Sequence, residues 1–412
     1  MVRMLKRSTV FFVMPLLACA ADVAQLASDP AVRSAFEIVK RNEPEILAAQ
    51  RRVCEIAAPP FAEKARGVEF VRIFTALGLK NVRMDAVGNV IGERQGKSEH
   101  PNLLLAAHLD TVFGPEVDVH NKTTGTVTKG PGIADDCRGL AVLIGVIRAL
   151  DEAKIVTPGT ITFAANVGEE GLGDLRGVKH MFDVSLKGKI DNFISIDGTG
   201  LGITRIGVGS YRYKVAFTGP GGHSFGSFGN ANPIHALGRA IAKISDFQVT
   251  LAPKVTFNVG RIGGGTSVNS IAFESWAEVD MRSSDAASLK AIDEKFKTVV
   301  QLALNEENER WKNKGKIAVE IKLLGYRPAG ETPESAAIVQ TAKSVAKALG
   351  HEARVGEGST DSNYPMSFKA PAITIGGGGT GTGAHSLDEA FDSTDSWKGT
   401  QRALLLAVSL VQ

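Results

Sequence analysis

The sequence predicts an α/β protein whose larger domain has a mostly parallel central sheet flanked by helices, interrupted by a smaller α+β domain. Short, continuous apolar runs alternate with longer segments of helical periodicity, which is typical of strands that helices bury on both faces. The chain has 412 residues, more than the roughly 250–300 residues that one hydrophobic core usually serves. A central segment follows a different order of strands and helices. We therefore expect two domains.

The larger domain contains four apolar runs that predict strands buried on both faces. They are Asn102–Asp110, Thr160–Asn166, Asn192–Ile196 and Pro371–Ile375. Helical periodicity covers Asp29–Ala57, Glu63–Leu77, Leu140–Leu150 and part of Pro328–Gly350, and Asn81–Gly92 alternates as a hairpin does around Gly88-Asn89. In open α/β sheets, ligands bind beyond the carboxyl ends of the strands. Functional residues are therefore expected where these four runs end.

The central segment predicts a β-α-β-β-α-β unit, which is a small four-stranded sheet with two helices. Its expected strands are Tyr211–Thr218, Lys254–Gly263, Ser270–Met281 and Ala318–Leu324, and its expected helices are Pro233–Phe247 and Leu289–Trp311. We place this smaller domain at residues 209–327. The larger domain then comprises residues 21–208 and 328–412.

The first 20 residues predict a secretory signal. A basic segment, Met1–Arg7, precedes the apolar run Ser8–Ala21, which is too short to span a bilayer. Ala18-Cys-Ala20 fits cleavage by signal peptidase, whereas Leu16-Leu-Ala-Cys19 fits a lipoprotein signal with Cys19 as the lipidated residue. We expect an exported protein, periplasmic or extracellular, without a membrane span, and keep a lipid anchor at Cys19 as the alternative.

Composition excludes some classes of partner. The 47 basic and 44 acidic residues leave a net charge of +3, and no basic stripe is present, so nucleic acid is not expected to bind. The glycine run before His385 lacks the Lys-Ser/Thr of a phosphate-binding loop. Cys54 and Cys137 lie far apart in the sequence, so no disulfide framework is expected, and Cys54 is interpreted as a small buried apolar residue.

Adjacent carboxylates, Asp135 and Asp136, open the predicted helix that contains Leu140–Leu150. They lie in the Gly- and Pro-rich segment Gly130–Gly139, which permits sharp backbone bends. Negative charge is favoured at the N-terminus of a helix. Taken alone, the pair can equally be a helix cap with a solvated neighbour.

Metal-competent residues follow each of the four predicted strands. His108 and Asp110 end the first strand with their side chains on one face, so that Asp110 can orient His108. The second strand is followed by Glu169-Glu170, the third by Asp197, and the fourth by a glycine loop that carries His385. Each residue alone is weak evidence, but four strands that end in such residues indicate a metal site.

Five motifs in order, AAHLDTV, GPGIADDCRG, NVGEEGLG, SIDG and GTGAHS, together with GPGGHS in the inserted domain, resemble one known family. This is the dizinc peptidase and deacylase family that includes peptidase T, bacterial dipeptidases, carboxypeptidase G, acetylornithine deacetylase and succinyl-diaminopimelate desuccinylase. The resemblance covers nearly the whole mature chain. Many members have lysine after the Asp pair, whereas this chain has Cys137, which places it nearer to the peptidase T-like branch.

The resemblance implies a catalytic domain that binds two Zn²⁺ ions, with Co²⁺ or Mn²⁺ as alternatives. It implies that His108 and Asp197 bind one ion, that Glu170 and His385 bind the other, and that Asp135 bridges them. A cis peptide would join Asp135 to Asp136, and Asp110 would orient His108.

The resemblance also assigns the remaining roles. Glu169 would be the general base that takes a proton from the metal-bridging water. The inserted domain would be a lid and dimerisation domain whose His223, supplied by the partner subunit of a homodimer, stabilises the oxyanion. Asn269 and Arg282 would bind the substrate, with Arg282 contacting a carboxylate.

We therefore expect a zinc-dependent enzyme that hydrolyses amide bonds in short peptides, as an exopeptidase of the di- or tripeptidase kind. The first alternative is an N-acyl amino acid deacylase, which uses the same residues on a different acyl group. A binding protein that has kept the fold without activity is the alternative from another class.

Overall fold

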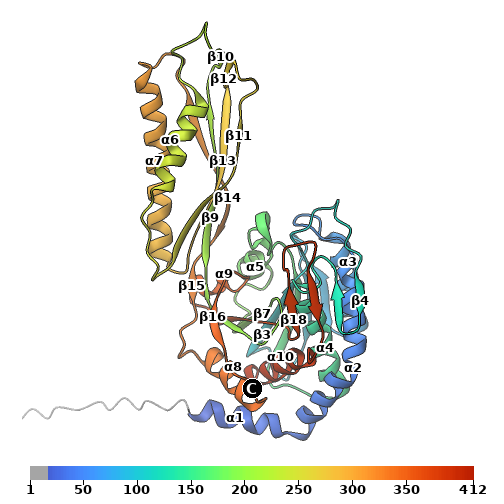
Figure 1. Ribbon diagram of the computed structural model, residues 1–412. Coiled ribbons are helices and arrows are strands. Elements are labelled where there is room, and N and C mark those ends of the chain that lie inside the picture. The colour runs from blue at the N-terminus through green and yellow to red at the C-terminus, as the bar shows by residue number, and fades with distance from the viewer. Residues whose placement is uncertain (1–16) are drawn as a thin grey trace, which may run out of the picture.

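The computed structural model describes residues 17–412 and contains two domains (Figure 1). The signal prediction for residues 1–20 lies largely outside the described residues, and the lipidation prediction at Cys19 concerns a side chain that is not described. Within residues 17–412, no helix combines the length and the apolar character that a membrane crossing requires.

The larger domain is built on a nine-stranded sheet with the order β1-β2-β6-β3-β7-β17-β8-β15, in which β16 also pairs with β8. Its central strands β6, β3, β7 and β17 are mutually parallel and are the four strands predicted from the apolar runs. The predicted hairpin is present as the antiparallel pair β1–β2, and it forms one edge of the sheet. The bounds are β1 Lys80–Met84, β2 Val90–Arg94, β3 Asn102–His108, β6 Thr160–Asn166, β7 Asn192–Ile196, β8 Ile203–Gly207, β15 Gly330–Glu331, β16 Val355–Gly358 and β17 Ala372–Ile375.

Helices cover both faces of this sheet, which explains why its central strands are apolar throughout. In β3, Leu103, Leu105 and Ala107 pack into the core beneath α2, α4, α8 and α10. Leu104 and Ala106 pack on the opposite face, on the side of α5 and α9. The helices are α1 Leu17–Ser28, α2 Pro30–Cys54, α3 Lys64–Ala76, α4 Cys137–Glu152, α5 Arg176–His180, α8 Ala337–Ala348, α9 Asn363–Ser367 and α10 Trp397–Leu410, with short turns η1 Gly171–Gly173 and η2 Met181–Ser185.

The smaller domain is an antiparallel sheet with the order β11-β13-β9-β14, covered on one face by α6 and α7. It extends away from the larger domain, with β10 and β12 at its far end and the first residues of β9 at its base (Figure 1). The bounds are β9 Gly209–Thr218, β10 Gly222–His223, α6 Pro233–Ser245, β11 Val255–Gly264, β12 Ser270–Ile271, β13 Glu274–Ser283, α7 Ala286–Arg310 and β14 Ala318–Arg327.

One strand prediction in this domain was wrong. The segment Ser270–Met281, expected as one strand, forms two, because β12 pairs with β10 whereas β13 pairs with β9 and β11. The chain changes partner at Ala272-Phe273, and this change separates the tip of the domain from its main sheet.

A second small sheet, with the order β18-β19-β5-β4, was not predicted. Its strands are β4 Lys122–Thr124, β5 Val127–Lys129, β18 Thr380–Thr382 and β19 Ala390–Asp392. Because β19 pairs with β5, this sheet joins the segment before Asp135 to the loop that carries His385.

The two cysteines of the larger domain form a disulfide, contrary to our expectation. Cys54 ends α2 and Cys137 begins α4, and their Cα atoms lie 5.5 Å apart although 83 residues separate them in the sequence. Cys54 is buried, as expected, but it is not a free thiol. No local pattern marks the pairing, because only the packing of α2 against α4 brings the two residues together.

Candidate active site

The predicted metal ligands meet at the carboxyl ends of the central strands. His108 is the last residue of β3, Glu170 follows β6, and Asp197 follows β7 directly. Asp135 lies in the turn before α4 and His385 lies in the loop between β18 and β19. The parallel strands β6, β3 and β7 end at the same edge of the sheet, and the two loops extend over it.

Asp135 lies between the two histidines and presents one oxygen to each. Its Oδ1 is 3.1 Å from His108 Nε2, and its Oδ2 is 3.2 Å from His385 Nε2. His385 Nε2 is also 3.0 Å from Glu170 Oε1. A carboxylate with this placement can bridge two metal ions.

Two groups of side chains, which share Asp135, could each hold a cation. In each group the donor atoms lie within 4.8 Å of one another, and the groups are His108, Asp135, Asp197 and Asp135, Glu170, His385. A third group of this kind comprises His108, Glu169 and Glu170. The first two groups coincide with the two ligand sets that the family resemblance implies.

Buried acids dominate the electrostatics of this cluster. Burial, reinforced by the charge of Asp135, raises the pKa of Asp197 well above its usual range. Burial also acts to raise the pKa of Asp135, but hydrogen bonds from His108 and His385 outweigh it and keep this pKa low. Hydrogen bonds with Asp135 and Glu170 raise the pKa of His385 to about 10. The cluster thus favours added positive charge, which fits divalent cations with nitrogen and carboxylate ligands.

Asp110 orients His108, but through its backbone. His108 Nδ1 lies 2.9 Å from the carbonyl oxygen of Asp110 and 3.7 Å from its carboxylate. The carboxylate instead accepts hydrogen bonds from the backbone N–H groups of Glu169 (3.1 Å) and Glu170 (2.8 Å). Asp110 therefore positions the acidic pair as well as the histidine, a second contact that its spacing from His108 did not indicate.

The turn that carries Asp135 is held from two sides. The peptide between Asp135 and Asp136 is cis, as the resemblance implied. Asp136 caps α4 by accepting a hydrogen bond from Gly139 N, and it also accepts one from His108 N at 3.1 Å. Asp136 thus fixes His108 and Asp135 relative to each other.

Glu389 is a functional residue that the sequence analysis missed. Its buried carboxylate accepts hydrogen bonds from the backbone N–H groups of Gly132 (3.0 Å), Ala134 (2.8 Å) and Asp135 (3.0 Å). It lies four residues beyond His385, so it ties the loop of one predicted ligand to the turn of another. It belongs to none of the motifs, and its proximity to His385 was the one available signal.

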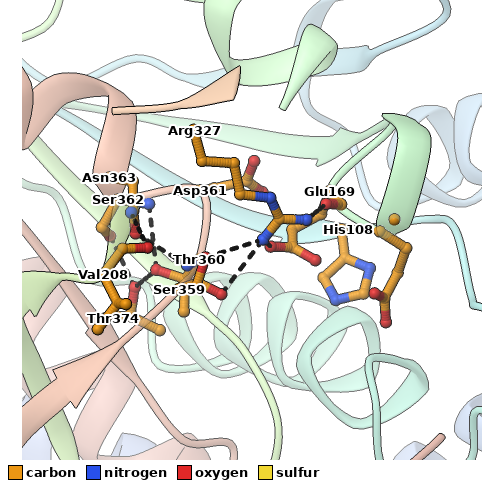
Figure 2. A network of polar contacts seen from close by, with 12 residues as sticks. His108, Glu169, Val208, Arg327, Ser359, Thr360, Asp361, Ser362, Asn363 and Thr374 are labelled. Atoms are coloured by element: carbon orange, nitrogen blue, oxygen red, sulfur yellow. Dashed lines mark hydrogen bonds and ion pairs between the residues drawn. The ribbon is translucent and has the colours of Figure 1, made fainter. Parts of the chain in front are cut away.

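Arg327 was missed as well. It ends β14, and its Nη1 lies 2.8 Å from Glu169 Oε1 in a buried ion pair (Figure 2). Its Nη2 donates to the carbonyl oxygen of the same residue. The predicted general base thus has a cationic partner from the smaller domain.

The structure does not bring the predicted residues of the smaller domain to the metal cluster of the same chain. His223 and Asn269 lie together at the far end of that domain, where β10 pairs with β12 and Ser224 N donates to Asn269 O at 2.9 Å (Figure 1). Arg282 lies at the other end of β13, where it forms an ion pair with Asp280 at 2.8 Å. It lines a pocket of about 140 Å³ with Lys254, Thr256 and Glu357.

Comparison with known proteins identifies the family. A model of peptidase family M20/M25/M40 matches residues 104–408. The chain is 26% identical to an acetylornithine deacetylase of Yersinia pseudotuberculosis, over 73% of this chain and 77% of that protein. It is 28% identical to carboxypeptidase G2 of Pseudomonas sp., over 73% of this chain and 71% of that protein.

The fold also matches a solved structure of this kind. The structure of aminopeptidase PepT from Bacillus cereus superimposes with a TM-score of 0.72 at 20% identity, covering 90% of this chain and 99% of that one. This likeness confirms the expected α/β architecture with an inserted domain. The chain belongs to peptidase family M20/M25/M40 and is a metallopeptidase or amidohydrolase of that family.

Proposed function

We propose that the protein is a two-zinc exopeptidase that cleaves short peptides. The observation that carries the proposal is the position of Asp135, with one carboxylate oxygen toward His108 and the other toward His385. His108 and Asp197 would hold one ion, Glu170 and His385 the second, and Asp135 both. Bound Zn²⁺ would polarise the scissile carbonyl group and lower the pKa of a water molecule.

Glu169 is the general base of this proposal. Its carboxylate lies within 4.8 Å of donor atoms of His108 and Glu170, next to the ligand groups. It takes the proton of the attacking water and transfers it to the amine that leaves when the amide C–N bond breaks. Asp110 holds the backbone of Glu169 in place through the 3.1 Å hydrogen bond to its N–H group.

His223 is suited to donate a hydrogen bond to the developing oxyanion. Its Nδ1 accepts hydrogen bonds from the backbone N–H groups of Phe225 and Gly226, both at 3.2 Å. A neutral imidazole that accepts at Nδ1 carries its proton at Nε2, where it is a donor. Oxyanion stabilisation requires such a donor.

The separation of the lid residues supports a homodimer. With a rise of about 3.4 Å per residue, the eight steps of β13 from Glu274 to Arg282 span roughly 27 Å. A dipeptide or tripeptide spans only about 7–11 Å. One substrate therefore cannot contact both ends of one lid, and we infer that His223 and Asn269 act in the partner subunit while Arg282 acts in its own.

The proposed substrate class rests on the family and on the positive charges at the end of the lid that adjoins the catalytic domain. Arg282 and Lys254 line one pocket, which suits a substrate carboxylate. Both a peptide and an N-acyl amino acid carry such a group, and the relatives include a carboxypeptidase and a deacetylase. We favour peptides and keep N-acyl amino acids as the second candidate. A silent binding protein accounts less well for a full set of ligands and a base.

The disulfide supports the proposed export. Structural disulfides persist mainly in oxidising compartments, and Cys54–Cys137 joins two helices of the catalytic domain. Mass spectrometry of the mature N-terminus, with membrane fractionation, tests this proposal. Cleavage near Ala20 would identify a soluble exported enzyme, a lipidated Cys19 would identify an anchored one, and an intact Met1 would contradict export.

Metal analysis coupled to a substrate panel tests the activity. Purified mature protein should contain two metal equivalents per chain and cleave di- and tripeptides until a chelator is added. Glu169→Gln should keep both metals, and its kcat should be lower than that of the wild type by about 10²- to 10⁴-fold. Turnover of N-acyl amino acids alone would move the enzyme to the deacylases, and absence of metal under replete conditions would contradict the ligand set.

A further inference from the structure

We propose that Arg327 is a positioning residue that couples the general base to the hinge of the lid. The inference rests on the proposed function, because it assumes that Glu169 is the base. It assigns a role to a residue that belongs to none of the motifs.

Arg327 lies where the lid joins the catalytic domain. The chain enters the lid through β9 and returns through β14, and Arg327, the last residue of β14, pairs with Ser210 near the start of β9. These two strands connect the domains in Figure 1, so a rotation of the lid would have to turn about them. The guanidinium group of Arg327 is therefore attached to the end of a connecting strand, next to the pivot of the lid.

Arg327 makes two hydrogen bonds to Glu169. Nη1 binds the carboxylate oxygen Oε1 at 2.8 Å, and Nη2 binds the backbone carbonyl oxygen of the same residue. The two side chains are only 5% and 6% exposed. A charged hydrogen bond away from water is strong and directional, so the planar guanidinium fixes both the backbone and the carboxylate of Glu169.

Asn363 of the catalytic domain holds both connections to the lid in place, close to Arg327. Asn363 Nδ2 donates to Val208 O at 2.9 Å and to Pro328 O at 3.0 Å, so one side chain binds the residues that adjoin β9 and β14 (Figure 2). Gly207 packs so closely that an added Cβ would lie 2.8 Å from Asn363 Cγ. The pivot is therefore fixed, and a change in lid angle acts on the side chain beside it.

The catalytic domain also offers Arg327 other partners. Its Nη1 lies 3.2 Å from Ser359 Oγ, and the buried Asp361 faces it in the same network (Figure 2). Asp361 Oδ2 accepts a hydrogen bond from Asn166 Nδ2 at 2.6 Å, whereas its Oδ1 has no partner among the described residues. The guanidinium thus contacts both Glu169 and Ser359, with the charge of Asp361 nearby, and a lid movement changes how it is shared between Glu169 and Ser359.

Steady-state kinetics of the dimetal enzyme on a cleaved peptide tests this role. Arg327→Met should keep both metals and lower kcat by about 10- to 100-fold, with KM changed less than about threefold, because misalignment of a base acts on the chemical step. Arg327→Lys should recover part of kcat, since it keeps the charge but not the two-point contact. Arg205→Met, which removes an arginine near the hinge that pairs with Glu331, is the matched control and should stay close to wild type.

The coupling to the hinge is tested by a double-mutant cycle. Asn363→Ser should lower kcat in the wild-type background and have little further effect in Arg327→Met. Additive effects would overturn the coupling. Unchanged kcat in Arg327→Met, a change confined to KM, or loss of metal or of folding in both Arg327 variants would overturn the positioning role. The proposed function fails separately, if Glu169→Gln retains turnover.

Discussion

His108 and His223 show how differently the two domains hold their functional residues. His108 is buried, with both ring nitrogens and its backbone N–H in contact with aspartates. His223 is exposed, and its ring binds the backbone of its own turn. The catalytic domain therefore presents a preorganised cluster, whereas the tip of the lid presents its predicted functional residues to solvent.

The tip of the lid also exposes large apolar side chains. Phe225 is 88% exposed and lies two residues beyond His223, and Phe273, which is 55% exposed, follows β12, the strand that pairs with β10 and His223. Large apolar side chains that gather at one end of a domain mark an interaction surface. The tip thus has the character of a subunit contact, in agreement with the proposed dimer.

Among these substitutions, removal of Asp135 in the catalytic domain should have the largest effect on metal binding and hydrolysis. Asp135→Ala removes the one carboxylate that lies between both histidines, so both metal equivalents and all measurable hydrolysis should be lost. Metal content and peptide turnover of the purified variant check this. Asp118→Ala, which removes an exposed aspartate paired with His120, is the control and should behave as wild type. Two retained metals in Asp135→Ala would contradict the bridging role.

His223→Ala should lower kcat by about 10²–10³ without loss of metal, the usual effect of removing one oxyanion donor. Mixing this variant with Glu169→Gln after subunit exchange gives heterodimers in which one site has an intact base and receives an intact His223. Activity should then reappear. If the mixture stays as inactive as its components, the histidine does not act across subunits.

The disulfide should contribute stability to the catalytic domain alone. Cys54→Ser with Cys137→Ser opens a loop closed across 83 residues, which should lower the free energy of unfolding by about 2–4 kcal/mol. Denaturant unfolding, compared with the wild type in reductant, measures the effect. If the double variant is as stable as oxidised wild type, the crosslink does not hold α2 against α4.

The smallest expected effect is a pH dependence of stability in the metal-free protein. Burial, and then the charge of Glu169, raise the pKa of Asp361 from 3.8 to about 7 in the folded state. The folded state therefore keeps a proton that the unfolded state releases, so this contribution to stability is complete below pH 3.8 and is lost as the pH rises through about 7.

Denaturant titrations of the chelator-treated protein between pH 5 and 8 test this sign. The free energy of unfolding should fall with a slope of at most about 1.4 kcal/mol per pH unit from this group, and Asp361→Asn should flatten that fall. Exposed Asp151→Asn serves as the control. An unchanged slope in Asp361→Asn would show that the proton is held elsewhere.

Local patterns predicted the central sheet because burial on both faces leaves a strong signature. The runs that form β3, β6, β7 and β17 are apolar at nearly every position. Because parallel strands end at one edge of the sheet, the positions of His108, Glu170 and Asp197 at or after the ends of these runs predicted that they lie close together. The hairpin around Gly88-Asn89 was predicted from a different signature, the alternation of apolar and polar residues. Where one segment changed partners, between β12 and β13, a pattern read along one chain could not show the break.

The fold class, the ordered motifs and the residues able to bind metal could be predicted from the sequence, because they depend on residue type and on neighbours along the chain. Tertiary structure decided which distant groups support them. Glu389 binds the Asp135 turn, Arg327 binds Glu169 across 158 positions, and Cys54 joins Cys137 across 83. Such contacts leave no periodicity in the sequence, since they arise only when packed elements bring a buried charge or thiol to a partner that satisfies it.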